Sequence, residues 1–233
     1  MQNLTKKKKI LFCGLAVVYT LALVVGACLM KHYTDWFTDK LLTTLITIAF
    51  VLLFLPLLVF ISKISMKKML INDMVFLALM IAVHVIFSRI LSIQTPITKI
   101  SLAFLPMTLC AIRMGAGYTM LMGGVSDIVG AIVFPVGAYF PGFTVTEIVR
   151  GFIFGFILHK KTTVPRATAT VVSSQIICSF LLNSFWLTFT GQEFIPTLIS
   201  RIPQTLIMMP VQIIGIMIFS KSLEKASLNK ILS

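Results

Sequence analysis

Two charged residues three positions apart, Glu147 and Arg150, lie in a stretch of this chain that is otherwise largely apolar. They follow a turn-rich aromatic loop over residues 134–143. Ionisable side chains at membrane depth are costly, so they usually face a protein interior or a cavity and mark a functional site. Irregular backbone is tolerated there only where protein buries it or where it lines a cavity. We therefore expect a polar binding site that opens at one face of a membrane protein.

The same stretch contains a signal for the start of a helix. The run from Thr144 to Glu147 matches the capping-box pattern, so Glu147 is either a helix cap, a ligand contact or both. A helix that begins near Thr144 would direct its positive end into the loop, which suits an anion. Arg150 lies one turn further along the same face, where an ion pair with Glu147 is the simpler interpretation.

Further candidate residues are spread along the chain. Arg89 and Arg201 lie near the ends of apolar runs, where each could simply reach into lipid head groups. Together with Lys99 they favour an anionic ligand over a neutral one. Asp127 lies in a glycine-rich run, and a neighbouring arginine is its expected partner. The remaining candidates carry hydrogen-bonding or planar aromatic side chains: Tyr139, Phe140, Phe143, Gln175, Asn183, Trp186 and Gln204.

The composition indicates a membrane protein with several spans. Of the 233 residues, 58% are hydrophobic and 12% are charged, and the mean hydropathy is +1.02. A soluble domain carries roughly 25% charged residues. The net charge of +13 comes from basic residues clustered at the ends of apolar runs, which argues against a nucleic-acid-binding domain. The cysteines and histidines form no metal-ligand motif, and no ATPase, zinc-protease or hydrolase motif is present, so we expect neither an enzyme nor a cofactor.

The apolar runs predict eight membrane helices. Two precede residue 69, and the other six contain the short spans and the charges expected at membrane depth. We therefore predict an all-α integral membrane protein with an N-terminal two-helix extension (1–69), a six-helix bundle (70–225) and a cytoplasmic tail (226–233). The expected spans are 10–30, 41–62, 73–92, 100–113, 116–135, 144–159, 167–190 and 196–220.

The distribution of basic residues orients these spans. Most lysines and arginines fall on one side of the membrane, which predicts that both termini are cytoplasmic. The loops over 93–99, 135–143 and 190–196 then face outward. The span ends that carry Arg89 and Arg201 lie on the same side, so these features converge on one outward-facing site.

Several of these motifs together resemble those of a known family. The segments that carry the resemblance are residues 88–106, residues 126–130, residues 134–144 with their specific Tyr-Phe-Pro-Gly-Phe-Thr run, and residues 201–204 with Pro210. They resemble the folate-specific substrate-binding (S) subunits of energy-coupling factor (ECF) transporters. The resemblance covers about residues 70–225 and implies six helices, so residues 1–69 depart from the family pattern.

The resemblance also implies a function and partners. An S subunit captures a vitamin outside the bacterial cell membrane and docks on a transmembrane coupling subunit that is driven by two cytoplasmic ATPases. Ala78 and Ala82 match the AxxxA motif by which the family's first helix docks. Folate suits the candidate residues, since its flat pterin ring can stack and hydrogen-bond and its glutamate tail carries two carboxylates.

Other functions remain open at this point. An S subunit for another vitamin or for a queuosine precursor would share most of these features. A proton-coupled secondary transporter would need a titrating relay, for which Glu147, Asp127 and His84 are candidates, but no internal repeat is visible. An intramembrane enzyme would need a nucleophile–base pair or a metal site, and the sequence contains no such constellation.

Overall fold

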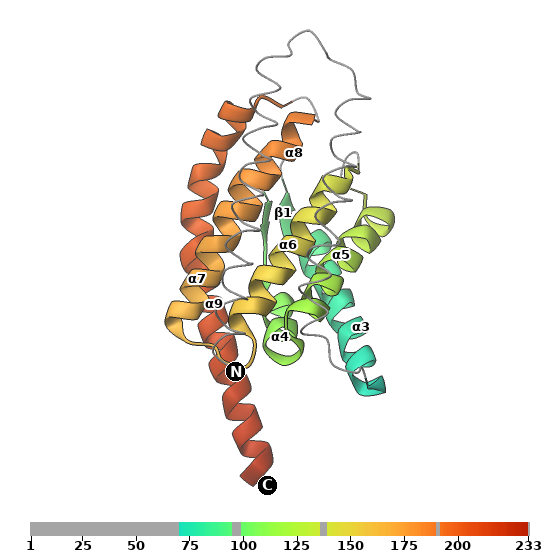
Figure 1. Cartoon of the computed structure of the whole chain (residues 1–233), viewed down its shortest axis with the longest axis vertical. Coiled ribbons are helices and arrows are strands. Elements are labelled where there is room, and N and C mark those ends of the chain that lie inside the picture. Colours follow the sequence, from blue (N-terminus) through green and yellow to red (C-terminus); the bar gives the residue numbers. More distant parts are fainter. Residues whose placement is uncertain (1–69, 95–98, 136–138, 190–191, 233) are drawn as a thin grey trace, which may run out of the picture. The chain divides into compact units, whose positions relative to one another are not determined.

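A computed structural model describes residues 70–232, apart from the short segments 95–98, 136–138 and 190–191 (Figure 1). The predicted two-helix extension over residues 1–69 lies outside the described residues. Within the described part, six helical segments and one short hairpin follow one another. In chain order the elements are α3 (Ile71–Val85), η1 (Ile86–Ile90), β1 (Ser92–Gln94), β2 (Lys99–Ser101), α4 (Phe104–Met114), α5 (Ala116–Val133), α6 (Pro141–Leu158), α7 (Val164–Ser174), η2 (Gln175–Leu182), α8 (Asn183–Phe189) and α9 (Phe194–Leu232).

Five of these helical segments are long and apolar enough to cross a membrane, and α4 is shorter. Two spans are composite, because η1 extends α3, and η2 joins α7 to α8 without a break. The prediction of a helical, multi-pass membrane bundle is confirmed. The 39 residues of α9 run to Leu232 rather than ending near residue 220, and Figure 1 shows its C-terminal part continuing beyond the other described helices.

Two turns bring the same end of four helices together. Gly115 has a φ of 83°, a conformation that glycine adopts at little cost, and it reverses the chain between α4 and α5. After α6 ends, the backbone N–H of Lys160 donates to the carbonyl of Ile112 at 3.3 Å. The turns α4–α5 and α6–α7 therefore lie side by side, at the end that the charge pattern predicts to be cytoplasmic.

The helices α5 and α6 pack with their backbones in close contact. A Cβ atom at Gly123 would lie only 2.5 Å from the backbone oxygen of Glu147. Small residues permit such close approach between membrane helices. This contact sets the position of α6, and with it the position of Glu147.

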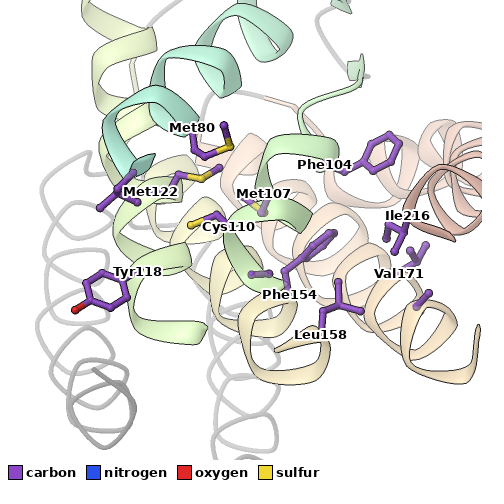
Figure 2. Close-up of a cluster of buried hydrophobic side chains, with 13 residues drawn as sticks. Met80, Phe104, Met107, Cys110, Tyr118, Met122, Phe154, Leu158, Val171 and Ile216 are labelled. Carbon is purple, nitrogen blue, oxygen red and sulfur yellow. The ribbon is translucent and has the colours of Figure 1, made fainter. Parts of the chain in front are cut away.

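The apolar core joins the same helices (Figure 2). Met107 and Cys110 of α4 are fully buried against Met122 of α5 and Phe154 of α6. The remaining helices contribute Met80, Val171 and Ile216 to the same cluster. Because Met107 and Phe154 also line the cavity described below, the core forms the apolar part of the cavity wall.

Candidate functional site

A cavity lies inside the bundle, and most of its lining side chains are polar. Residues of α3, β2, α5, α6, η2 and α9 contribute to it, and so does Asn183 at the start of α8. Five of the residues predicted to bind a ligand line this cavity: Glu147, Arg150, Asn183, Arg201 and Gln204. The structure thus brings together residues from helices that are far apart in the sequence.

Glu147 and Arg150 form an ion pair within α6, as their spacing predicted. Glu147 Oε1 accepts a hydrogen bond from Arg150 Nη1. The other carboxylate oxygen, Glu147 Oε2, is buried and has no hydrogen-bond partner among the described residues. One acceptor at the cavity therefore remains for a donor that the described chain does not supply.

The capping-box prediction for this helix is wrong. The helix α6 begins at Pro141, and its N-cap residue is Phe140 in an extended conformation. Proline is favoured in the first turn because its missing N–H is not needed there. Thr144 is consequently inside the helix, where its hydroxyl donates to Asp127 Oδ2 at 2.7 Å instead of capping the backbone.

Arg201 is buried, with 8% of its surface exposed, and lines the cavity from α9. It donates from Nη1 to the backbone oxygen of Ser179 at 2.8 Å. Its Nε has no hydrogen-bond partner among the described residues. Arg201 therefore faces the protein interior, and the alternative that it reaches into lipid head groups does not hold in this structure.

Arg89 has a different environment. Its Nη2 lies 3.0 Å from Asp127 Oδ1, and each side chain is 12% exposed. The expected arginine partner of Asp127 is thereby confirmed. Asp127 lines the cavity, whereas Arg89 is not part of the lining, so a ligand contact by Arg89 stays a prediction.

The predicted aromatic residues pack beside the cavity rather than lining it. Trp186 is 1% exposed, and its Nε1 donates to Thr146 Oγ1 at 3.0 Å. The ring of Phe140 lies between Trp186, at 5.7 Å, and Phe143, at 6.1 Å. Half-exposed Tyr139 bonds through its hydroxyl to Thr144 Oγ1 at 2.8 Å. These contacts anchor the start of α6, and stacking on a ligand stays a prediction.

Lys99 is described only through its backbone, which pairs with Gln94 in the hairpin. Its side chain lies outside the described part, so its role as a cation of the site also stays a prediction.

Sequence reasoning missed several polar residues of the cavity. Gln212 of α9 lines it and accepts a hydrogen bond from Gln175 Nε2 at 3.1 Å. A signal for Gln212 was present, since Arg201, Gln204, Met208 and Gln212 follow the three- and four-residue spacing of one helix face. His84, which the sequence singled out only as a candidate for a proton relay, is buried in the lining as well.

Among the described residues, the charged groups around the cavity carry more positive than negative charge. Asp127 pairs with Arg89, and Glu147 pairs with Arg150. Arg201 has no carboxylate partner among the described residues, and its hydrogen bond to Ser179 goes to a neutral carbonyl. A buried cation is stabilised by an anionic partner, so the cavity has the electrostatics of a site for an anionic ligand. No group of metal-ligating side chains occurs among the residues that the structure describes.

Comparison with known proteins gives consistent results. A family model described as "ECF-type riboflavin transporter, S component" matches residues 68–225. A folate transporter, FolT, of Clostridium novyi (strain NT) is 36% identical over 153 residues, which cover 65% of this chain and 88% of that protein. A FolT of Leuconostoc mesenteroides subsp. mesenteroides is 32% identical over 150 residues, covering 61% of this chain and 80% of that protein.

The fold has a solved relative as well. The crystal structure of FolT bound with folic acid superposes with a TM-score of 0.60 and 29% sequence identity. The match covers 63% of this chain and 90% of that chain. The likeness therefore extends over most of the solved chain.

Proposed function

We propose that this chain, which belongs to the family of S components of ECF-type transporters, binds folate outside the cell for ATP-driven uptake. The observation that carries the choice of ligand is that Arg201, in the cavity lining, has no carboxylate partner among the described residues. The curated relatives named above are folate transporters, and the solved relative holds folic acid.

Charge favours folate over a neutral vitamin. The family model's description names riboflavin, which has no carboxylate, whereas the glutamate tail of folate has two. A buried guanidinium without an anionic partner is costly, and pairing with a carboxylate recovers part of that cost. Of the two arginines that line the cavity, Arg201 is the one for which the described residues supply no carboxylate, so it is the proposed partner of the folate tail.

The pterin ring has complementary partners on α6. Glu147 Oε2 is a buried acceptor, and a pterin carries adjacent N–H donors on its ring and amino group. The apolar side chains of Phe104, Met107 and Phe154 line the same cavity and can pack against a flat ring. A concave site with an apolar wall and a few placed polar groups is the usual form of a small-molecule site.

The proposed partners follow from the family rather than from the geometry. We assign ATP hydrolysis to two separate cytoplasmic ATPases and transmission to a transmembrane coupling subunit. The predicted orientation, with both termini cytoplasmic, places the loops near Tyr139 and Arg201 outside. Folate would enter from that side.

Calorimetric titration of the purified full-length protein tests the choice of ligand. We expect folate to bind most tightly, pteroate to bind more weakly because it lacks the glutamate tail, and riboflavin to bind least. Tighter binding of riboflavin or of a queuosine precursor would reject folate as the ligand.

Reconstitution in liposomes tests the mode of transport. Uptake should need the coupling subunit, the ATPases and ATP, whereas binding should need none of them. Folate accumulation by this chain alone under a proton gradient would instead support a secondary transporter, in which His84 and Glu147 are the first relay candidates to examine.

A further inference from the structure

The continuous helical segment formed by α7, η2 and α8 contains a π-helix next to the cavity. The π-helix covers Gln175–Leu182 and lies between two α-helical segments. Gln175 and Ser179 line the cavity from it, and Asn183 lines the cavity directly after it. A π-helical turn inserts extra backbone into an α-helix, and such turns are frequent at functional sites.

The end of this π-helix changes which carbonyl accepts a hydrogen bond. The backbone N–H of Asn183 donates to the carbonyl of Cys178, five residues back. In an α-helix it would donate to the carbonyl of Ser179, four residues back. The Ser179 carbonyl therefore does not accept the hydrogen bond from Asn183, at the point where the π-helix returns to an α-helix.

Arg201 of the neighbouring α9 donates to that carbonyl. The distance from Arg201 Nη1 to Ser179 O is 2.8 Å. A guanidinium is planar and holds its five N–H donors in a fixed fork, so a bond at one edge constrains the direction of the others. A second hydrogen bond, from Gln175 Nε2 to Gln212 Oε1 at 3.1 Å, joins the beginning of η2 to α9 as well.

We propose that the π-helical turn Gln175–Leu182 is a positioning element for ligand recognition: its Ser179 carbonyl holds Arg201 so that the remaining guanidinium donors meet a carboxylate of the ligand. Ser179 acts through Arg201 and is therefore a positioning residue. This inference rests on the proposed function, because it names the group through which the cavity selects an anionic ligand.

Weakening the Ser179 carbonyl without changing any side chain tests this role. Replacing Phe180 by its α-hydroxy analogue in the full-length chain turns the amide between Ser179 and Phe180 into an ester, whose carbonyl is a poorer acceptor. We expect the affinity for folate to fall about fivefold to tenfold, because a bond to a charged group is weakened. The affinity for 6-methylpterin should stay unchanged, since this compound keeps the pterin ring but carries no carboxylate.

The same ester in an Arg201→Gln background separates positioning from a general structural effect. If Ser179 acts through Arg201, the ester should there change folate affinity less than about twofold. A matched ester at Ile177, in the same π-helix, alters the carbonyl of Ile176 and should leave folate affinity unchanged. Equal losses for folate and 6-methylpterin, or a full loss that persists in the Arg201→Gln background, would overturn the proposal.

A second variant keeps the test decisive if the ester chain does not fold. Arg201→Lys keeps the positive charge but lacks the planar fork, so we expect at least a roughly tenfold loss of folate affinity with 6-methylpterin affinity unchanged. Folate affinity near that of the original protein would show that charge alone suffices. Failure of the unmodified protein to bind folate would reject the proposed function, whereas folate binding that is insensitive to these variants would reject only the positioning role.

Discussion

Arg89 at the end of the first described span donates from Nη2 to Asp127 Oδ1 of α5 at 3.0 Å. The other carboxylate oxygen accepts from the hydroxyl of Thr144 at 2.7 Å, and Tyr139 in turn bonds to Thr144. A Cβ atom at Gly130 would lie 2.7 Å from Arg89 Nε, so the glycine leaves room for the arginine. A buried ion pair is tolerated when its remaining hydrogen-bonding capacity is filled, as it is for Asp127. The network thus ties η1, α5 and the start of α6 together beside the cavity.

Asp127→Asn should destabilise the protein by about 3–5 kcal/mol, because it leaves Arg89 buried without its carboxylate. Unfolding in detergent, followed by circular dichroism, measures this change. The double variant Arg89→Gln with Asp127→Asn should recover part of the stability, since it removes the remaining charge. Its folate affinity, compared with that of Asp127→Asn alone, separates the two roles of Arg89: equal affinity indicates a structural pair, and a further loss despite recovered stability indicates a ligand contact by Arg89.

Arg201→Gln should lower folate affinity roughly 10- to 150-fold, the effect of losing a charge-assisted hydrogen bond. Calorimetry with folate and with 6-methylpterin, which carries no carboxylate, measures the effect, and 6-methylpterin should lose little. Arg113→Gln is the matched control, because Arg113 is half exposed, lies 3.6 Å from Asp73 and covers the ring of Phe76. Equal losses in both variants would show that Arg201 has no special relation to the ligand.

Gly123→Ala should destabilise the bundle more than Gly124→Ala does. The added Cβ would meet the backbone of Glu147 at 2.5 Å at the first position, but only the side chain of Ile148 at 2.9 Å at the second. A side chain can rotate away from the added methyl group, whereas a clash with the backbone is relieved only if α5 and α6 move apart. Overpacking of this kind costs about 1–3 kcal/mol. Thermal unfolding of both variants compares the costs. Equal stability of the two variants would contradict the close backbone contact inferred here.

Within residues 70–232 the sequence was sufficient to predict the spans, because hydropathy and length dominate the choice of membrane helices. It misplaced the start of α6, since the pattern from Thr144 to Glu147 fits a capping box while Pro141 fits the first turn of a helix that begins earlier. The hairpin Ser92–Gln94 with Lys99–Ser101 and the two π-helices were not predicted. These features depend on packing and on single displaced hydrogen bonds, for which a periodic pattern gives no signal.

The two ion pairs at the site differ in how far the sequence specified the partner residue. The pair of Glu147 and Arg150 follows from helical spacing alone. Arg89 and Asp127, by contrast, are 38 positions apart, and their contact depends on how η1 packs against α5. Trp186 was a candidate for stacking because aromatic side chains suit flat ligands; its contact with Phe140 and its bond to Thr146 Oγ1, 40 positions away, gave no signal in the sequence.

One face of α3 is open along its length. Ala78 and Ala82 are exposed on it, and the large apolar side chains of Met74, Val75 and Leu79 are more than half exposed. Small residues one turn apart let another helix approach closely. This exposure agrees with the proposed docking of a coupling subunit, and it contrasts with the expectation for alanines that pack within the bundle.

Ala78→Trp or Ala82→Trp should therefore prevent docking without affecting the cavity. The indole would hold a partner helix away from α3, so co-purification of the coupling subunit and uptake should be lost. The ligand site lies between other faces of the bundle, so folate affinity should be unchanged. Ile207→Trp on α9 is the control, since Ile207 is equally apolar and 60% exposed. Both quantities should be measured on each variant, by calorimetry and by affinity pull-down from cells that express the whole complex. Loss of folate binding together with docking would show that the alanines pack within this chain. Intact co-purification and uptake would show that they only face lipid, because a docking helix could not accommodate an indole at the contact.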